Sequence, residues 1–322
     1  MCNFRDMILR EFPDLGWLKR QIDQGFRDKK GWGNLQLETE GFPSVVIYTP
    51  AGECYRPDVK GPISLFVNLK GTSRCTVEGE TRTVREDTYF ISNRGQPYTY
   101  EVARGESTET FNIHFGENFA ESALNALLLP AERVLDRGDR QELSELRFFN
   151  RLYRRDADFD AIVDWMLRSY RENGFQSLLF QEQLFCLLRL LVKEDRAVRA
   201  AIDALPPVRS STRVELYKRL NRSVDYIHSY FPAAIELRDL AAAACLSKYH
   251  FLRLFKQAYG VSPYQYIQEL RLVKARQLLS GTNMPVGDIA DLLGFLNPQS
   301  FSRLFFLRSG AYPGAYRAGA SK

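Results

Sequence analysis

Polar and basic side chains recur at matched positions of a pattern that this chain contains twice. The first copy carries Tyr249 and Arg253, and the second carries Gln299, Ser302 and Arg303. Arginine pairs bidentately with guanine and glutamine with adenine, so side chains of these types on one helix face can read base edges in a DNA groove. These five residues are therefore the candidates for contacting bases.

The repeat itself covers more than the polar positions. Seven residues of the first copy return fifty positions later: Phe251, Arg253, Leu254, Phe255, Gly260, Pro263 and Tyr266 return as Phe301, Arg303, Leu304, Phe305, Gly310, Pro313 and Tyr316. An internal repeat of this period is a direct sign of architecture. Each copy is too short to bury much apolar surface alone, so we expect the copies to share a core or a common helix.

Each copy has the pattern of a helix-turn-helix unit. An alanine-rich helix at 237–244 leads through a tight turn to a second helix at 248–259, and the second copy repeats this at 286–293 and 298–308. Ser247 and Asn297 are placed as N-caps of the second helices. We expect subdomains at about 237–259 and 286–308, joined by a helix at 263–279.

The joining helix predicts how the two units would meet DNA. About 17 residues at ~1.5 Å per residue set the reading helices roughly one DNA turn, ~34 Å, apart. Both would then enter successive major grooves on one face of the duplex. Phosphate contacts give affinity without sequence information. The residues expected to make them are Ser247, Lys248, Lys256, Arg271 and Lys274.

Charge divides the chain in the same place. Residues 209–322 hold 16 lysines and arginines against 7 aspartates and glutamates, a net charge of +9, whereas residues 1–208 carry −4. Such asymmetry indicates that the C-terminal part meets a polyanion, although a basic domain without a partner shows the same count. A Pro- and Ser-containing stretch at 205–213 marks the linker, and the DNA-binding domain is expected at 214–322.

Residues 218–317 resemble the DNA-binding domain of the AraC/XylS family of bacterial transcription regulators. The matching motifs are Asp239-Leu240-Ala241, Asp288-Ile289-Ala290, Gly294-Phe295, Gly260-x-Ser262-Pro263, Phe301-x-Arg303-x-Phe305 and Gly310-x-x-Pro313-x-x-Tyr316-Arg317. The resemblance implies two helix-turn-helix subdomains, each placing a recognition helix in the major groove of double-stranded DNA. It also implies RNA polymerase as a partner and a bacterial, cytoplasmic location.

Three positions depart from that family's pattern. Phe306 stands where a basic residue is usual, Tyr312 where Ser or Thr is usual, and Leu252 where a polar base reader is common. We therefore expect the first copy to supply more phosphate affinity, and the second to supply much of the sequence preference.

The first 200 residues predict a different fold. From about residue 42, short strands alternate with Gly-containing turns, which indicates an antiparallel barrel or sandwich. The fold class expected is multidomain α+β, with an N-terminal antiparallel β-barrel at 1–116, a helical linker or dimerisation segment at 117–204, and a C-terminal all-α double helix-turn-helix domain. The barrel more weakly resembles the cupin-like regulatory domains of the same family, which bind a small effector.

Helices are expected at 14–30, 119–129, 141–154, 159–172 and 176–200. The apolar stripe of the last helix fits two interpretations equally: packing against the barrel, or pairing in a homodimer.

An effector pocket would draw on the aromatic residues of the barrel. Phe66, Tyr98 and Tyr100 sit at alternating positions, and Arg74 is placed to hold an anionic group. Barrel mouths are common ligand sites. Aromatic residues in strands are more often core than ligand contacts, so the plainer interpretation is packing.

The residues needed for metal or catalytic chemistry are scarce. Of the three histidines only His114 lies in the barrel, where we expect a strand residue facing ligand or solvent, and no cofactor or metal is expected. The chain is therefore predicted not to be an enzyme. Two alternatives stay open: a regulator controlled by a protein partner, and a cupin enzyme with a DNA-binding tail. The N-terminus lacks an apolar signal core, and no membrane span is expected.

Overall fold

The computed structural model describes residues 6–9, 44–50, 53–128 except 104 and 106, 147–173, and 177–320 except 207, 208, 232 and 234. The chain forms two compact units, Met1–Ala197 and Val198–Lys322. The helix expected at 14–30 lies outside the described residues. The division between the units falls shortly before the expected linker at 205–213, and the domain boundaries stay predictions.

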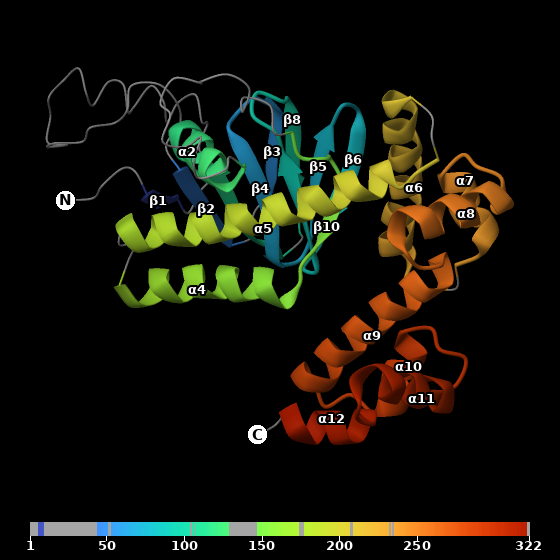
Figure 1. Ribbon diagram of the computed structural model, residues 1–322. Coiled ribbons are helices and arrows are strands. Elements are labelled where there is room, and N and C mark those ends of the chain that lie inside the picture. Colours follow the sequence, from blue (N-terminus) through green and yellow to red (C-terminus); the bar gives the residue numbers. More distant parts are fainter. Residues whose placement is uncertain are drawn as a thin grey trace, which may run out of the picture. The chain divides into compact units, whose positions relative to one another are not determined.

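The first unit is built on two facing β-sheets (Figure 1). One sheet has the strand order β1-β2-β9-β4-β7-β10 and the other β3-β8-β5-β6. The strands are β1 Asp6–Leu9, β2 Ser44–Pro50, β3 Cys54–Val59, β4 Ile63–Lys70, β5 Ser73–Val77, β6 Glu80–Val84, β7 Thr88–Ser92, β8 Tyr98–Val102, β9 Glu109–Phe115 and β10 Leu152–Arg154. All pairings are antiparallel except β1 with β2, which is parallel. This arrangement confirms the expected antiparallel β domain, with one parallel edge added.

Both faces of the six-stranded sheet are covered. One face meets the four-stranded sheet, where Phe66 of β4 contacts Tyr98 of β8. The other meets α4, whose Phe159 stacks on Tyr89 of β7 at 4.3 Å between ring centres. This explains why every residue of β7 is buried, because a strand between two packed layers has no solvent face.

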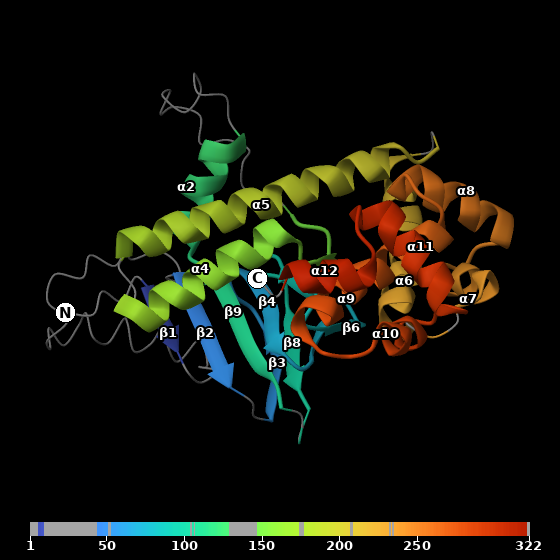
Figure 2. The ribbon, with the colours of Figure 1, turned by 90° about the horizontal axis from the view of Figure 1, so that it is seen from below.

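Three helices of this unit have clear bounds: α2 Glu117–Leu128, α4 Ala157–Asn173 and α5 Ser177–Asp203. Helices α4 and α5 lie side by side in both views (Figures 1 and 2), and Gln183 of α5 donates to Ser169 of α4 at 2.9 Å. The apolar stripe of α5 is buried at Phe180, Leu184 and Leu187. The apolar stripe of α5 is thus covered by packing within the unit, whereas the sequence leaves packing and homodimer pairing equally open.

Two segments differ from expectation. The helix expected at 141–154 is wrong in its described part, since Leu152–Arg154 forms β10 beside β7. Strand β3 was not expected. It contains Pro57, and its pairing with β8 shifts register near Asp58, whose φ is +49°. Proline and a bulge are tolerated because β3 is an edge strand, and both hide the period-two pattern.

The second unit is entirely helical. Its helices are α6 Ser210–Tyr230, α7 Leu237–Ala243, α8 Lys248–Tyr259, α9 Pro263–Gly281, α10 Val286–Leu292, α11 Pro298–Ser309 and α12 Pro313–Ala320. Within this unit α9 runs from the α7–α8 pair to the α10–α12 group (Figure 1). The two expected helix-turn-helix copies and their joining helix are confirmed. Helix α6 begins at Ser210, so the last four residues of the expected linker are helical.

The helix ends follow the capping residues that the sequence indicates. Ser247 caps α8 by accepting from the amide of His250, and Asn297 caps α11 by accepting from the amide of Ser300 at 2.7 Å. Gly260 and Gly310 end these two helices in the left-handed region at φ +74° and +72°. Glycine reaches this region without a Cβ clash, which is why both copies stop at the same position.

The turns of the two copies share one backbone pattern. Leu246 donates its amide to Ala241 O at 2.9 Å, and Phe295 donates to Ala290 O at 3.0 Å. The residue before each donor has positive φ, at Cys245 in the first copy and at a glycine in the second. The second turn is then one residue longer. The added residue, Leu296, is fully exposed.

Candidate nucleic-acid interface

Helix α8 separates its packing face from its outward face. Phe251 and Phe255 are fully buried, whereas Tyr249 is 74% exposed and Arg253 is exposed. Positions 249, 253 and 256 recur at steps of three or four, which places Tyr249, Arg253 and Lys256 along one stripe of the helix. Leu252, 40% exposed, lies in the same stripe. The structure therefore brings the expected base-contacting residues of the first copy together.

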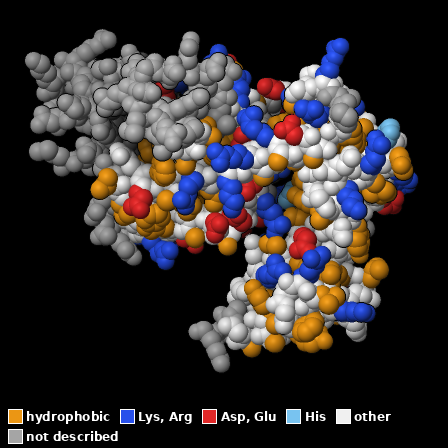
Figure 3. All heavy atoms as spheres, in the orientation of Figure 1, with side chains coloured by type: hydrophobic (Ala, Val, Ile, Leu, Met, Phe, Trp, Pro, Cys, Tyr) orange, Lys and Arg blue, Asp and Glu red, His pale blue; other side chains and the backbone are white. Residues whose placement is uncertain are grey.

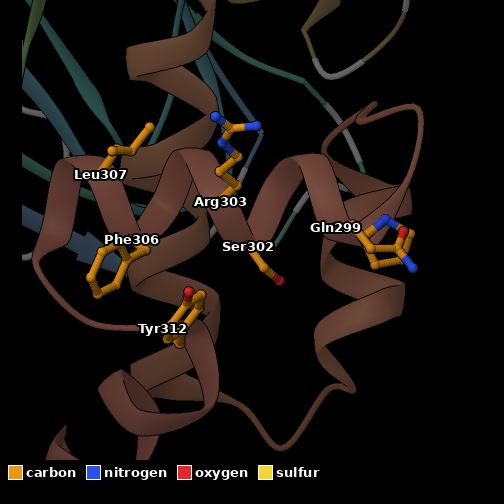
Figure 4. Close-up of a pocket in the computed structure, with 7 residues that line it drawn as sticks. Gln299, Ser302, Arg303, Phe306, Leu307 and Tyr312 are labelled. Atoms are coloured by element: carbon orange, nitrogen blue, oxygen red, sulfur yellow. The ribbon is translucent and has the colours of Figure 1, made fainter.

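Helix α11 presents the equivalent stripe beside a groove of about 800 Å³. The groove is lined by Pro298, Gln299, Ser302, Arg303, Phe306, Leu307 and Tyr312. Figure 4 shows Gln299, Ser302 and Phe306 following one another along the helix, with Arg303 projecting away from its axis. All three expected base-contacting residues of this copy thus share one surface.

The apolar end of that groove is an aromatic pair. Phe306 and Tyr312 stack at 4.6 Å between ring centres, with Phe306 40% and Tyr312 58% exposed (Figure 4). Exposed hydrophobic side chains lie among lysines and arginines over this part of the unit (Figure 3). Contiguous exposed apolar side chains are a feature of interaction surfaces.

The expected phosphate-contacting residues divide into two groups. Ser247, Lys248 and Lys256 are exposed around α8, and Lys274 is half-buried on α9. Arg271 differs, because only 9% of it is exposed and it donates to Ala233 O at 3.4 Å. Burial also lowers the pKa of its guanidinium. Arg271 therefore belongs to the interior of the domain, whereas the other four are exposed or half-buried.

In the first unit, three of the four expected effector-contacting residues lie together. Phe66 stacks on Tyr100 at 5.1 Å and meets Tyr98 edge-on at 5.0 Å, all between the two sheets. Burial raises the pKa of both tyrosine hydroxyls. Arg74 is not part of this group. It lies opposite Glu101 on the outward side of the four-stranded sheet, with its guanidinium 3.5 Å from that carboxylate.

The space between the sheets also holds a cation that the sequence interpretation missed. Arg82 is 8% exposed and its guanidinium carbon lies 5.9 Å from the centre of the Phe90 ring. It also forms a 2.5 Å ion pair with Glu80. The sequence contains a signal for the burial of Arg82. Arg82 lies two residues before Val84, which faces inward, and alternate residues of a strand share a face.

Polar residues on β9 were missed as well. Thr110, Asn112 and His114 alternate with Phe111 and Ile113, and all five are buried. The polar members face the other sheet. A period-two run of polar residues inside an apolar strand is the signal that identifies this inward polar stripe.

The sequence predicts that His114 faces ligand or solvent. His114 is buried and neutral, so the solvent alternative is wrong. Its Nδ1 lies 2.8 Å from Ser64 Oγ, and burial lowers its pKa to about 4. Among the described residues, no group of three or more His, Cys, Asp or Glu side chains is arranged to hold a metal ion. The helices in the described part of the chain also lack the length and apolar character that a membrane crossing requires.

The chain carries two helix-turn-helix units on one joining helix, and its first unit is a domain of two β-sheets. This combination defines a regulator of the DNA-binding class. Comparison with known proteins agrees: residues 240–319 match the model of a helix-turn-helix domain and residues 49–191 match that of an AraC-like ligand binding domain. Between them the two models cover more than half of the chain. This chain belongs to the AraC family of transcription regulators.

Individual relatives are distant. The chain is 27% identical to the probable transcriptional regulator LumQ of Photobacterium leiognathi over 178 residues, 53% of this chain and 64% of that protein. It is 24% identical over 275 residues to the HTH-type transcriptional regulator YisR of Bacillus subtilis, which covers 83% of this chain and 89% of the relative. The arabinose operon regulatory protein of Escherichia coli is 28% identical over 116 residues, 36% of this chain and 40% of that protein.

Proposed function

We propose that this protein is a sequence-specific DNA-binding transcription regulator that reads two successive major grooves with α8 and α11. The observation that carries the proposal is the matched outward stripe of the two helices. It holds Tyr249 and Arg253 in one copy and Gln299, Ser302 and Arg303 in the other. The basic charge of the C-terminal part supports the same partner, because phosphate neutralisation drives binding to duplex DNA.

Helix α9 sets the scale of the contact. Its 19 residues span about 28 Å at 1.5 Å per residue. This length is close to one turn of B-DNA, ~34 Å, which is the distance between successive major grooves on one face. The length of α9 supports a separation of the two recognition helices that suits one continuous site of two elements.

Roles follow from side-chain chemistry. Arg253 and Arg303 are suited to guanine, and Gln299 to adenine. Around them Ser247, Lys248, Lys256 and Lys274 would hold phosphates, which fix the register of the protein on the duplex. We assign no phosphate role to Arg271, because its guanidinium is engaged inside the domain.

A small effector bound between the two sheets would control this activity. The aromatic faces of Phe66 and Tyr100 offer stacking surfaces there. Ser92 Oγ and Thr110 Oγ1 are buried without a hydrogen-bond partner in the described part of the chain. Buried hydroxyls are rarely left unsatisfied, so a polar ligand or water between the sheets accounts for them.

The remaining assignments come from the family and not from a site on this chain. The regulator would act in the bacterial cytoplasm as a homodimer and would contact RNA polymerase. Dimerisation raises apparent affinity because the second binding event becomes intramolecular. It would have no catalytic activity of its own.

The test is selection of bound sequences from random duplex DNA with the full-length protein. We expect enrichment of a site with two elements whose centres lie about one DNA turn apart. A bound pool that stays as random as the starting pool would exclude sequence-specific reading. For the effector, a thermal-shift screen should identify a compound that stabilises the wild type and stabilises Thr110→Val less, because that variant lacks the inward hydroxyl.

A further inference from the structure

Arg271 lies near the middle of α9 and contacts residues on both sides of it. On one side it donates to Ala233 O at 3.4 Å, in the segment that connects α6 to the first copy. On the other side its guanidinium carbon lies 5.6 Å from the centre of the Phe295 ring, in the turn of the second copy. One side chain therefore connects the segment that leads into the first copy with the turn of the second copy.

The Phe295 end of this connection leads directly to the second recognition helix. The Phe295 ring lies 5.0 Å from that of Phe301, and Phe301 is a fully buried core residue of α11. Phe295 therefore links the Arg271 guanidinium to the packed core of α11. The contact acts on the element that carries Gln299 and Arg303.

The Ala233 end is also tied to the second copy. Phe231, at the C-terminus of α6, packs against the hydrophobic core that includes Leu272, Ile289 and Phe305. Its amide donates to Ile227 O at 2.8 Å, so its backbone continues from α6. Phe231 thus contacts the core of the second copy, and Arg271 holds the nearby Ala233 by a hydrogen bond.

Arginine has properties at this position that lysine lacks. A guanidinium is planar, stacks on an aromatic face and donates in several directions at once, whereas an ammonium is a strongly hydrated point charge. Burying a cation is costly unless it is paired and hydrogen-bonded. Arg271 is 9% exposed, and its guanidinium has a backbone acceptor at Ala233 and an aromatic ring at Phe295.

We propose that Arg271 is a positioning residue that sets the distance and angle between α8 and α11, and with them the spacing of DNA elements that the protein accepts. The part of the inference that concerns the spacing of DNA elements rests on the proposed function, and the part that concerns the placement of α8 and α11 does not. Without the Arg271 contacts, the copies would be joined by the α9 rod, by the contacts that each copy makes with it, and by the packing of Phe231 on the core of the second copy. Torsion about that rod would then change where the two recognition helices point.

A phosphate contact is the competing explanation for a basic residue here, and Arg271→Lys separates the two. Lysine is an adequate phosphate ligand as a point charge, so a phosphate role predicts near-wild-type binding. A positioning role predicts that Arg271→Lys behaves like Arg271→Ala, because neither variant keeps the planar contact with Phe295. Lys274→Ala, on the same helix, is the matched control for loss of a phosphate contact.

The DNA experiment measures affinity of the full-length protein for duplexes in which the two selected elements are moved apart or together by one or two base pairs. The wild type should lose about a hundredfold when the spacing is changed, since a rigid pair of readers then loses one of them. Both Arg271 variants should bind the best spacing about tenfold more weakly and show a spacing penalty about tenfold smaller. Lys274→Ala should lower affinity by one common factor at every spacing. Equal spacing penalties in Arg271→Ala and wild type would overturn the proposal.

A second measurement needs no DNA. Nitroxide labels at Gln257 and Leu307, exposed residues at equivalent places on α8 and α11, report the distribution of distances between the two helices. Endogenous reactive cysteines would first be replaced by serine. The distribution should broaden in both Arg271 variants and keep its width in Lys274→Ala, with helical content unchanged by circular dichroism. An unchanged width in Arg271→Ala would refute positioning, even if the wild type selected no DNA and the proposed function failed.

Discussion

Phe306 and Tyr312 stack face to face at 4.6 Å, with 21° between their planes, at the positions where the first copy carries Lys256 and Ser262. The same two places on equivalent helices thus hold a cation and a cap in one copy, and an aromatic pair in the other. The two copies therefore present different chemistry at this place on their surfaces.

This substitution makes a prediction about salt dependence. Phe306→Lys should raise affinity for specific and random DNA alike, and should steepen the dependence of log affinity on log salt concentration by about one unit, because one more phosphate is neutralised. The measurement is fluorescence anisotropy across a salt series. The reverse exchange in the first copy, Lys256→Phe, should flatten the slope by a similar amount. An affinity gain confined to the selected sequence would contradict a phosphate effect.

Base reading by Arg303 is tested by truncation. Arg303→Ala should cost about 1–3 kcal/mol of binding free energy and relax the preference at one base pair, and Arg253→Ala should do the same at another. Lys256→Ala is the control and should weaken all sequences alike. Gel shifts on selected and random duplexes measure both effects. If Arg303→Ala weakened the two duplexes equally, Arg303 would be a phosphate contact.

The second unit was predictable from the sequence because its signals are local. Ser247, Asn297, Gly260 and Gly310 act on the nearest turn of helix, and the apolar spacing of each copy sets its core. Arg271 could not be assigned in this way. Its place in the interior depends on Ala233 and Phe295, which lie 38 residues before it and 24 after it, and a basic residue on a helix reads as exposed in sequence alone.

The first unit was less predictable, for related reasons. Pro57 and the register shift of β3 remove the alternation that identifies a strand, and β10 is only three residues long. His114 is buried by the pairing of strands far apart in the sequence, and Arg82 by the packing of one sheet on the other, and composition reveals neither. The sequence interpretation places Arg74 with the aromatic group, but Arg74 faces outward, and it is the neighbouring residue in the chain that faces inward. A one-residue difference in a strand reverses the face.

Two glycines with the same backbone conformation should respond differently to alanine. Gly71 has φ +74°, and an added Cβ would lie 2.7 Å from Ser107 O, whereas Gly310 has φ +72° and open space around it. Gly310→Ala should lower the free energy of unfolding by about 1 kcal/mol, which is the cost of the left-handed conformation alone. Gly71→Ala adds a backbone clash and should lower it by about 3 kcal/mol.

Each variant can be followed in its own unit. All three tryptophans, at positions 17, 32 and 165, precede the second unit. Tryptophan fluorescence during urea unfolding therefore reports the unit that contains Gly71. Circular dichroism at a helix wavelength follows the helices of both units, so the effect of Gly310→Ala is the change in circular dichroism that tryptophan fluorescence does not report. Equal losses in the two variants would show that the strand contact around Gly71 relaxes without cost.

His114 predicts a pH dependence of stability in the first unit. Its pKa in the folded protein is about 4, against an ordinary value of 6.5, because burial disfavours the charged ring. Between these values the unfolded chain binds a proton that the folded chain does not. Stability is therefore unaffected above pH 6.5 and falls as pH drops towards 4, by up to about 3 kcal/mol.

The measurement compares urea unfolding of the wild type and of His114→Asn by tryptophan fluorescence from pH 7.5 to pH 4.5. The stability difference between the two proteins should shrink with falling pH, because only the wild type carries this penalty. A difference that stayed constant across the range would mean that His114 titrates normally in the folded state.

Leu296, the extra residue in the second turn, has a consequence for orientation. It lengthens the path from α10 to α11 relative to the path from α7 to α8, so the two recognition helices are preceded by unequal turns. On the proposed function, two unlike readers on one rod would bind an asymmetric site, and the protein would point along the duplex in one direction. A single subunit would thereby distinguish upstream from downstream, which a symmetric reader needs a second signal to do.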